Sequence, residues 1–181
     1  YGIVHPREQW SSSRGMRLSP FYQREKELDA VFFETAGWER PYWYESNRKL
    51  LKEFGAKVVD RSNEWDARWW SPIINAEHLA MRDRVGMVDL SAFAIFDVIG
   101  AGALDYIQKL TVAQMNVAPG KAVYTPLLNH AGGMKSDLTI TRLSDVSFRI
   151  VTGGSQGGID GKWFRDNLPA DGSVQLHDMT T

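Results

Sequence analysis

The sequence contains no cysteine, and this absence excludes disulfides, thiolate zinc sites, iron–sulfur clusters and a cysteine nucleophile. It contains no apolar run near the roughly 18 residues that a membrane-spanning helix requires. It also lacks the basic and then apolar N-terminus of a signal peptide. An excess of one charge is missing too: the formal net charge is −1, which gives no support to binding of nucleic acid or of an anionic membrane surface.

The length and composition are ordinary for a globular protein, with 181 residues, 43% of them hydrophobic and 24% charged. A chain of this length corresponds to one domain or slightly more, and it can bury a sizeable core. It opens at Tyr1 without an initiator Met and stops at Thr181, just past an expected strand. We therefore expect a piece excised from a longer polypeptide, with N-terminal processing as the alternative.

Residues 1–70 differ from the rest because all seven Trp except Trp163 lie there, among Tyr, Arg and Pro. Hydrophobic periodicity is poor, so we expect an irregular, aromatic-rich segment that packs against another structure. Within it the residue pattern predicts a strand over 30–34, a turn over 37–41, a returning strand over 42–44 and a helix over 45–54 that ends at Gly55.

From Ser71 onward the pattern becomes regular. Ser71 followed by Pro72 is typical of a helix start, and Gly86 is a candidate stop. The helical spacing predicts an apolar face with a partly buried His78, formed by Ile74, His78, Met81 and Val85. Further elements are expected as strands over 93–99, 122–129, 134–143, 148–152 and 174–177, and as helices over 102–110 and 159–168. This order indicates an α+β fold with a mainly antiparallel sheet.

Two glycine motifs invite functional interpretations. Residues 153–157 match the G-x-S-x-G of a hydrolase nucleophile elbow, but only His177 follows Ser155 as a possible base. A glycine-rich strand-to-helix turn with a capping Ser155 is the simpler interpretation. Gly100 and Gly102 follow a strand as in a dinucleotide loop, but Asp105 stands at the third glycine position and would repel a pyrophosphate. We therefore interpret that pair as a turn before a helix.

The histidines give no metal site, since His5, His78, His130 and His177 are dispersed and no acidic ligand cluster accompanies them. We accordingly predict no bound metal. His130 lies in the loop of an expected hairpin, and the sequence suggests no function for it.

The hairpin over 122–143 carries the most informative pair of side chains. If its turn is centred between His130 and Ala131, Tyr124 and Asp137 are direct cross-strand neighbours, roughly 5 Å apart at Cβ. If the turn is centred one residue later, they are diagonal neighbours at about 7–8 Å. Either register places an aromatic ring and a carboxylate on one face, where a flat heteroaromatic ligand could stack and form hydrogen bonds. An exposed Asp shielded by a Tyr is the alternative.

The same hairpin carries a family resemblance. Its motifs are Tyr124-Thr125, Leu127-Leu128-Asn129, Gly132-Gly133 and Ser136-Asp137-Leu138-Thr139. Supporting motifs are Glu77-His78-Leu79-Ala80, Asp89-Leu90-Ser91, Gly102-Ala103-Leu104 and Val151-Thr152-Gly153-Gly154. Together they resemble the first half of the folate-binding aminomethyltransferase domain of the glycine-cleavage T-protein family. Upstream, Ser19-Pro20-Phe21-Tyr22 and Gly37-Trp38-Glu39-Arg40-Pro41 resemble the linker of dimethylglycine and sarcosine dehydrogenases.

The resemblance implies a domain division and an activity. Residues 1–70 would be the central linker of a flavin-dependent oxidoreductase, and residues 71–181 the N-terminal half of the folate domain. In such enzymes a flavin half oxidises an N-methyl amine to an iminium, and the folate half transfers the one-carbon unit to tetrahydrofolate. The resemblance assigns the essential carboxylate to Asp137 and the aromatic folate contact to Tyr124. It also implies a parent in the bacterial cytoplasm or the mitochondrial matrix.

The chain departs from the family in parts that are missing. The FAD-binding half and the C-terminal half of the folate domain are absent, so both would be partners supplied by the parent, and nucleic acid and membrane are not expected as partners. Pro126 interrupts the strand beside Tyr124, which predicts an edge strand or a bulge. A folate-binding or regulatory module that has lost the transfer chemistry is the alternative function, and a Ser155 hydrolase is a third.

Overall fold

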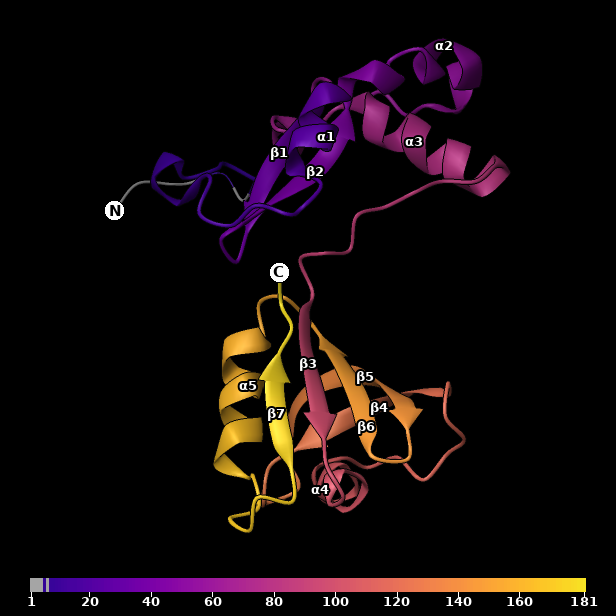
Figure 1. Ribbon diagram of the computed structural model, residues 1–181. Coiled ribbons are helices and arrows are strands. Elements are labelled where there is room, and N and C mark those ends of the chain that lie inside the picture. The colour runs from indigo at the N-terminus through magenta and orange to yellow at the C-terminus, as the bar shows by residue number, and fades with distance from the viewer. Residues whose placement is uncertain (1–4, 6) are drawn as a thin grey trace. The chain divides into compact units, whose positions relative to one another are not determined.

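The computed structural model describes His5 and residues 7–181. The chain forms two compact units, and the boundary between them along the sequence lies between Leu90 and Ser91 (Figure 1). The division lies beyond position 70, where the composition changes, so the helix that begins after Ser71 belongs to the first unit. Within the described part of the chain, no helix is both long enough and apolar enough to cross a membrane.

The first unit contains a β-hairpin and several short helices. Its strands are β1 (Ala30–Thr35) and β2 (Trp38–Tyr44), and its α-helices are α1 (Tyr22–Glu27), α2 (Leu50–Phe54) and α3 (Pro72–Asp83). Short 3-10 helices cover Ser11–Ser13, Glu45–Asn47, Gly55–Lys57 and Trp65–Ala67. The helix predicted over 45–54 is therefore split into a 3-10 turn and the five residues of α2, although Gly55 ends it with φ +46° as expected.

The predicted turn over 37–41 is wrong. The chain reverses at Ala36 and Gly37, which both have positive φ, and β2 already begins at Trp38. Pro41 is tolerated inside β2 because the pairing with β1 shifts register beside it, as at a bulge.

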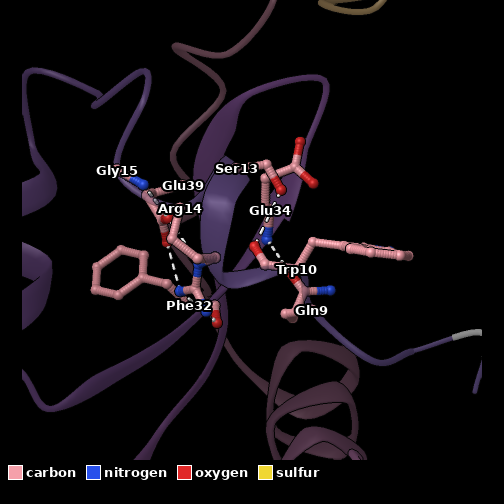
Figure 2. A network of polar contacts seen from close by, with 8 residues as sticks. All are labelled: Gln9, Trp10, Ser13, Arg14, Gly15, Phe32, Glu34 and Glu39. Carbon is pink, nitrogen blue, oxygen red and sulfur yellow. Dashed lines mark hydrogen bonds and ion pairs between the residues drawn. The ribbon is translucent and has the colours of Figure 1, made fainter. Parts of the chain in front are cut away.

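A buried carboxylate joins this hairpin to the preceding segment. Glu39 is 3% exposed and accepts hydrogen bonds from Arg14 Nε and Nη2 at 2.7 and 2.6 Å, and from the Gly15 backbone N–H at 2.7 Å (Figure 2). Arg14 Nη2 also donates to the Phe32 carbonyl on β1. These bonds lower the pKa of Glu39, the Arg14 hydrogen bond contributing most. An acidic residue within a β-strand is thus accounted for by a structural role.

Helix α3 begins as predicted but buries a different face. The Ser71 side chain accepts a hydrogen bond from the Ile73 backbone N–H, and Pro72 takes the first helical position. The buried residues are Ile73 and Ala76, because α3 packs against α2 and β2 through that side. The predicted partly buried His78 is wrong, since His78 is exposed. The helix also ends at Asp83 rather than at Gly86.

The second unit is a five-stranded antiparallel sheet with two helices, in the strand order β4-β5-β6-β3-β7. Its elements are β3 (Ala94–Ile99), α4 (Ala103–Leu110), β4 (Ala122–Leu128), β5 (Met134–Ser144), β6 (Ser147–Thr152), α5 (Gly157–Asp166) and β7 (Gln175–Asp178). The order of elements after Ser71 is the predicted one, and the α+β fold is confirmed. Strand β4 lies at the sheet edge, which explains how Pro126 is accommodated.

The core of the second unit lies between one face of the sheet and helices α4 and α5. Alternate residues of the strands point into it, as the period of two predicts, and the largest are Phe96, Phe148 and Ile150. Phe164 from α5 meets Phe96 edge to face at 5.7 Å. Full burial of each such side chain contributes roughly 2 kcal/mol to the free energy of unfolding. Within the described second unit, α4 and α5 do not cover the opposite face of the sheet, which is called the open face below and presents the candidate site.

The backbone at Gly100, in the glycine pair before α4, has a conformation that requires glycine. Its φ is +137°, and a Cβ added there would lie 2.1 Å from the Ser173 carbonyl oxygen. A side chain is therefore excluded at Gly100 by backbone geometry, and the turn interpretation of this motif is confirmed.

Candidate functional site

The register of the β4–β5 hairpin fixes how the predicted site residues meet. Tyr124 pairs with Thr139, and Asp137 pairs with Pro126. Tyr124 and Asp137 are therefore diagonal neighbours, which is the second of the two expected registers. Both side chains lie on the open face, because the alternate residues Ser136, Leu138 and Ile140 point into the core.

Tyr124 and Asp137 are in direct contact. The Tyr124 hydroxyl donates a hydrogen bond to Asp137 Oδ2, although Tyr124 is 67% exposed. This hydrogen bond is the main cause of a raised pKa of the Tyr124 phenol, because deprotonation would place two negative oxygens side by side. The pair thus presents a tyrosine ring to solvent and holds the carboxylate in one orientation.

This arrangement can bind a flat ligand that carries N–H groups. The exposed ring offers an apolar surface for stacking, and Asp137 Oδ1 is left to accept a further hydrogen bond. A carboxylate in this position can also stabilise a developing positive charge on a ligand amine or remove its proton. In the described part of the chain, no three His, Asp or Glu side chains are grouped so as to hold a metal ion.

An ion pair also lies on the open face and was not predicted from the sequence. Arg149 on β6 donates from Nε and Nη2 to both oxygens of Asp97 on β3, at 2.8 Å each. The hydrogen bond from Arg149 is the largest cause of the lowered pKa of Asp97. His177 on β7, which is the cross-strand partner of Asp97, lowers this pKa by a smaller amount. An aspartate between Phe96 and Val98 in a strand was the sequence signal for this pair.

A buried carboxylate lies behind the site. Asp160 on α5 is fully buried, and its Oδ2 accepts hydrogen bonds from Ser136 at 2.9 Å and Thr152 at 2.6 Å. Since Ser136 directly precedes Asp137, these bonds tie the strand that carries the candidate carboxylate to the helix beneath it. Asp160 Oδ1 is buried and has no hydrogen-bond partner among the residues that the structure describes. The sequence gives no signal of this burial, because an acid in the first turn of a helix is typical of a surface residue favoured by the helix dipole.

The surroundings of Ser155 do not have the arrangement of a hydrolase active site. Among the described residues, no hydrogen bond joins Ser155 to a histidine or a carboxylate, and His177 lies on β7 opposite Asp97. Residues 153–157 form a turn into α5, closed by the Gln156 backbone N–H donating to the Gly153 carbonyl. The expected capping by Ser155 is wrong, because Gln156 occupies the N-cap position and no side chain caps the helix.

Comparison with protein families gives one match to most of the chain. Residues 21–181 match the family described as the GCVT N-terminal domain. The match covers both compact units rather than the second alone.

The curated relatives include proteins of different kinds. The chain is 30% identical over 99% of its length to the mitochondrial pyruvate dehydrogenase phosphatase regulatory subunit of Mus musculus, covering 20% of that protein. It is 36% identical over 84% of its length to a 4-methylaminobutanoate oxidase (formaldehyde-forming) of Paenarthrobacter nicotinovorans, covering 18% of it. It is 31% identical over 68% of its length to an aminomethyltransferase of Synechococcus sp., covering 34% of it. The chain therefore spans about a fifth of the length of the first two.

A solved structure supports the fold. The glycine cleavage system aminomethyltransferase T from Bartonella henselae superposes with a TM-score of 0.70 over 92% of this chain and 39% of that chain, at 22% identity. This likeness confirms the expected T-protein-like fold. With the family match over residues 21–181, it leads to the conclusion that the chain belongs to the GCVT N-terminal domain family.

Proposed function

We propose that this chain is the folate-binding portion of a flavin-dependent enzyme that removes a methyl group from an N-methyl amine and transfers the one-carbon unit to tetrahydrofolate. The observation that carries the proposal is the contact between Tyr124 and Asp137 on an open sheet face. The relatives support it, because they include a formaldehyde-forming oxidase of a methylamino acid, a sarcosine dehydrogenase and aminomethyltransferases.

The residues present fit one edge of a reduced pterin. Tetrahydrofolate, when bound, supplies the amine nitrogens that accept the one-carbon unit. The Tyr124 ring would stack on its flat part, and the free oxygen of Asp137 would accept a hydrogen bond from an amine N–H. Asp137 would then orient that amine toward the incoming carbon and offset positive charge as the new bond forms.

The flavin does not fit this chain, since Gly100 opens a turn whose third motif position is Asp105 rather than glycine. FAD would therefore be bound by other parts of the parent enzyme, and the oxidation would take place there.

An anaerobic calorimetric titration of the full chain with tetrahydrofolate tests the proposal. We expect saturable binding that Asp137→Asn weakens by about tenfold, the equivalent of roughly 1.4 kcal/mol. Asp105→Asn is the matched control, because it removes an exposed carboxylate on α4 and should leave affinity unchanged. Binding that is absent, or that both substitutions affect equally, would overturn the assignment of the site.

A non-catalytic folate-binding or regulatory module is the second candidate function. It is favoured by one observation: the relative that covers 99% of this chain is a regulatory subunit. The two candidates differ in whether the chain accelerates the condensation of formaldehyde with tetrahydrofolate above the uncatalysed rate. Acceleration that Asp137→Asn abolishes supports the enzyme, whereas tetrahydrofolate binding without acceleration supports the module.

A further inference from the structure

A cavity lies at the hairpin end of the second unit, beside helices α4 and α5. Its volume is about 340 Å³, which is within the range of small-molecule sites. Its lining comes from the end of α4, the β4–β5 loop and α5, and consists of Lys109, Leu110, Thr111, Leu128, Asn129, His130, Gly132 and Trp163. The loop histidine with no assigned function is therefore part of a cavity wall.

Trp163 contributes its indole ring to the wall of this cavity. Its indole Nε1–H is buried and has no hydrogen-bond acceptor within the described residues. A buried indole N–H normally finds an acceptor, because leaving it unpaired costs the full desolvation of the group. Since Nε1 is buried, a molecule in the cavity would contact the indole ring rather than this donor.

The polar groups around Trp163 are also donors or cations. Lys135 Nζ lies 4.6 Å from the centre of the Trp163 ring, and the His130 ring lies 4.9 Å from it. Asn129 uses its Oδ1 to accept from the backbone N–H groups of Ala131 and Gly133, which leaves its Nδ2 as a donor. Lys109 adds a second ammonium, and the lining contains no Asp or Glu. The cavity therefore selects against cations and favours an acceptor with negative charge.

The loop that carries these groups has a defined conformation. The Gly132 backbone N–H donates to the Asn129 carbonyl at 3.0 Å, and Asn129 N–H donates to the Gly133 carbonyl at 2.9 Å. Together with the two bonds to Asn129 Oδ1, these fix the loop from both ends. His130 and Asn129 are thus held at the cavity before any ligand arrives, which lowers the ordering cost of binding.

We propose that this cavity is a binding site for a small oxyanion, a carboxylate or phosphate group, recognised by Asn129, His130 and Lys109 beside the Trp163 ring. The site is separate from Tyr124 and Asp137, which lie on the face of the sheet away from the helices, and it does not depend on the folate proposal.

NMR of the full ¹⁵N-labelled chain tests the proposal, since each Trp gives one indole N–H signal. The Trp163 signal is assigned by its loss in Trp163→Phe. Inorganic phosphate and acetate are titrated separately, with chloride keeping the ionic strength constant. We expect a saturable shift of the Trp163 signal with at least one of the two, and the more tightly bound anion identifies whether a phosphate or a carboxylate is the natural group. Lys109→Met and His130→Asn should each weaken binding at least fivefold.

Matched controls separate a site from general charge effects. Lys121→Met removes an exposed ammonium of the same unit, and His78→Asn removes an exposed imidazole of the other unit; both should leave the affinity unchanged. The proposal is overturned if neither anion shifts the Trp163 signal saturably. It is also overturned if Lys121→Met weakens binding as much as Lys109→Met does.

Discussion

The Tyr124 hydroxyl donates to the Asp137 carboxylate across a diagonal of the β4–β5 pairing, because Tyr124 is directly opposite Thr139 and Asp137 is opposite Pro126. A direct pairing would have placed the two Cβ atoms closer, with less room for a hydroxyl between ring and carboxylate. The length of the tyrosine side chain spans the diagonal, so the ring leans along the strand toward Asp137 and stays exposed.

The first prediction concerns the titration of this phenol. The hydrogen bond to Asp137 raises the pKa of Tyr124 above the ordinary value, so Asp137→Asn should lower that pKa again. The Cζ resonance of Tyr124 in a ¹³C NMR titration reports it. Tyr106 is an internal control, because its raised pKa comes from burial and should not respond to Asp137→Asn. An unchanged Tyr124 titration would show that the contact does not persist in solution.

The second prediction separates the ring of Tyr124 from its hydroxyl. If the Tyr124 ring contributes by stacking, Tyr124→Phe should change the tetrahydrofolate affinity by less than threefold. Tyr124→Ala should reduce the binding free energy by about 1 kcal/mol, which is roughly a fivefold loss of affinity. Because Tyr124 is largely exposed, both variants should keep the free energy of unfolding within about 0.5 kcal/mol. Calorimetric titration of the two variants checks this, and equal losses would assign the effect to the hydroxyl.

The third prediction concerns the buried anchor. Asp160→Ala leaves the hydroxyls of Ser136 and Thr152 without an acceptor in the interior and should lower the free energy of unfolding by about 2–3 kcal/mol. Hydrogen exchange of the β5 and β6 amides measures this loss in the unit concerned. Asp166→Ala, on the exposed side of the same helix, should cost less than about 0.5 kcal/mol. Equal protection in the two variants would contradict the anchoring role.

The fourth prediction is a dependence on pH. Arg149 holds the pKa of Asp97 below its unfolded value, so the pair contributes its full stability above about pH 4 and loses it as pH falls through the lower folded pKa. Arg149→Met should therefore lower the free energy of unfolding by about 1 kcal/mol at pH 7 and by much less at pH 2. The value at pH 7 is modest because the guanidinium is half exposed and its charge is screened by water. Urea unfolding at both pH values checks this, with Lys121→Met as a control that should show no such difference.

The strands and helices of the second unit were largely predictable because their signals are local. The alternating apolar residues in 134–143 and 148–152 and the glycines at turns each depend on neighbours within a few positions. The first unit was less predictable, since the face of α3 that is buried depends on where α2 and β2 pack. This packing buries Ile73 and Ala76 and leaves His78 exposed to solvent.

By itself the sequence determined that Tyr124 and Asp137 share one face of a hairpin, that Pro126 requires an edge strand or a bulge, and that an α+β unit of this element order would form. Only the tertiary structure decided the register that brings the two side chains into contact. It also paired Asp97 with Arg149, buried Asp160 beneath Ser136, and gathered His130, Lys109 and Trp163 around one cavity. The physical reason is that periodicity fixes which way a side chain points, whereas its partners are set by hydrogen bonds and packing between segments far apart in the chain.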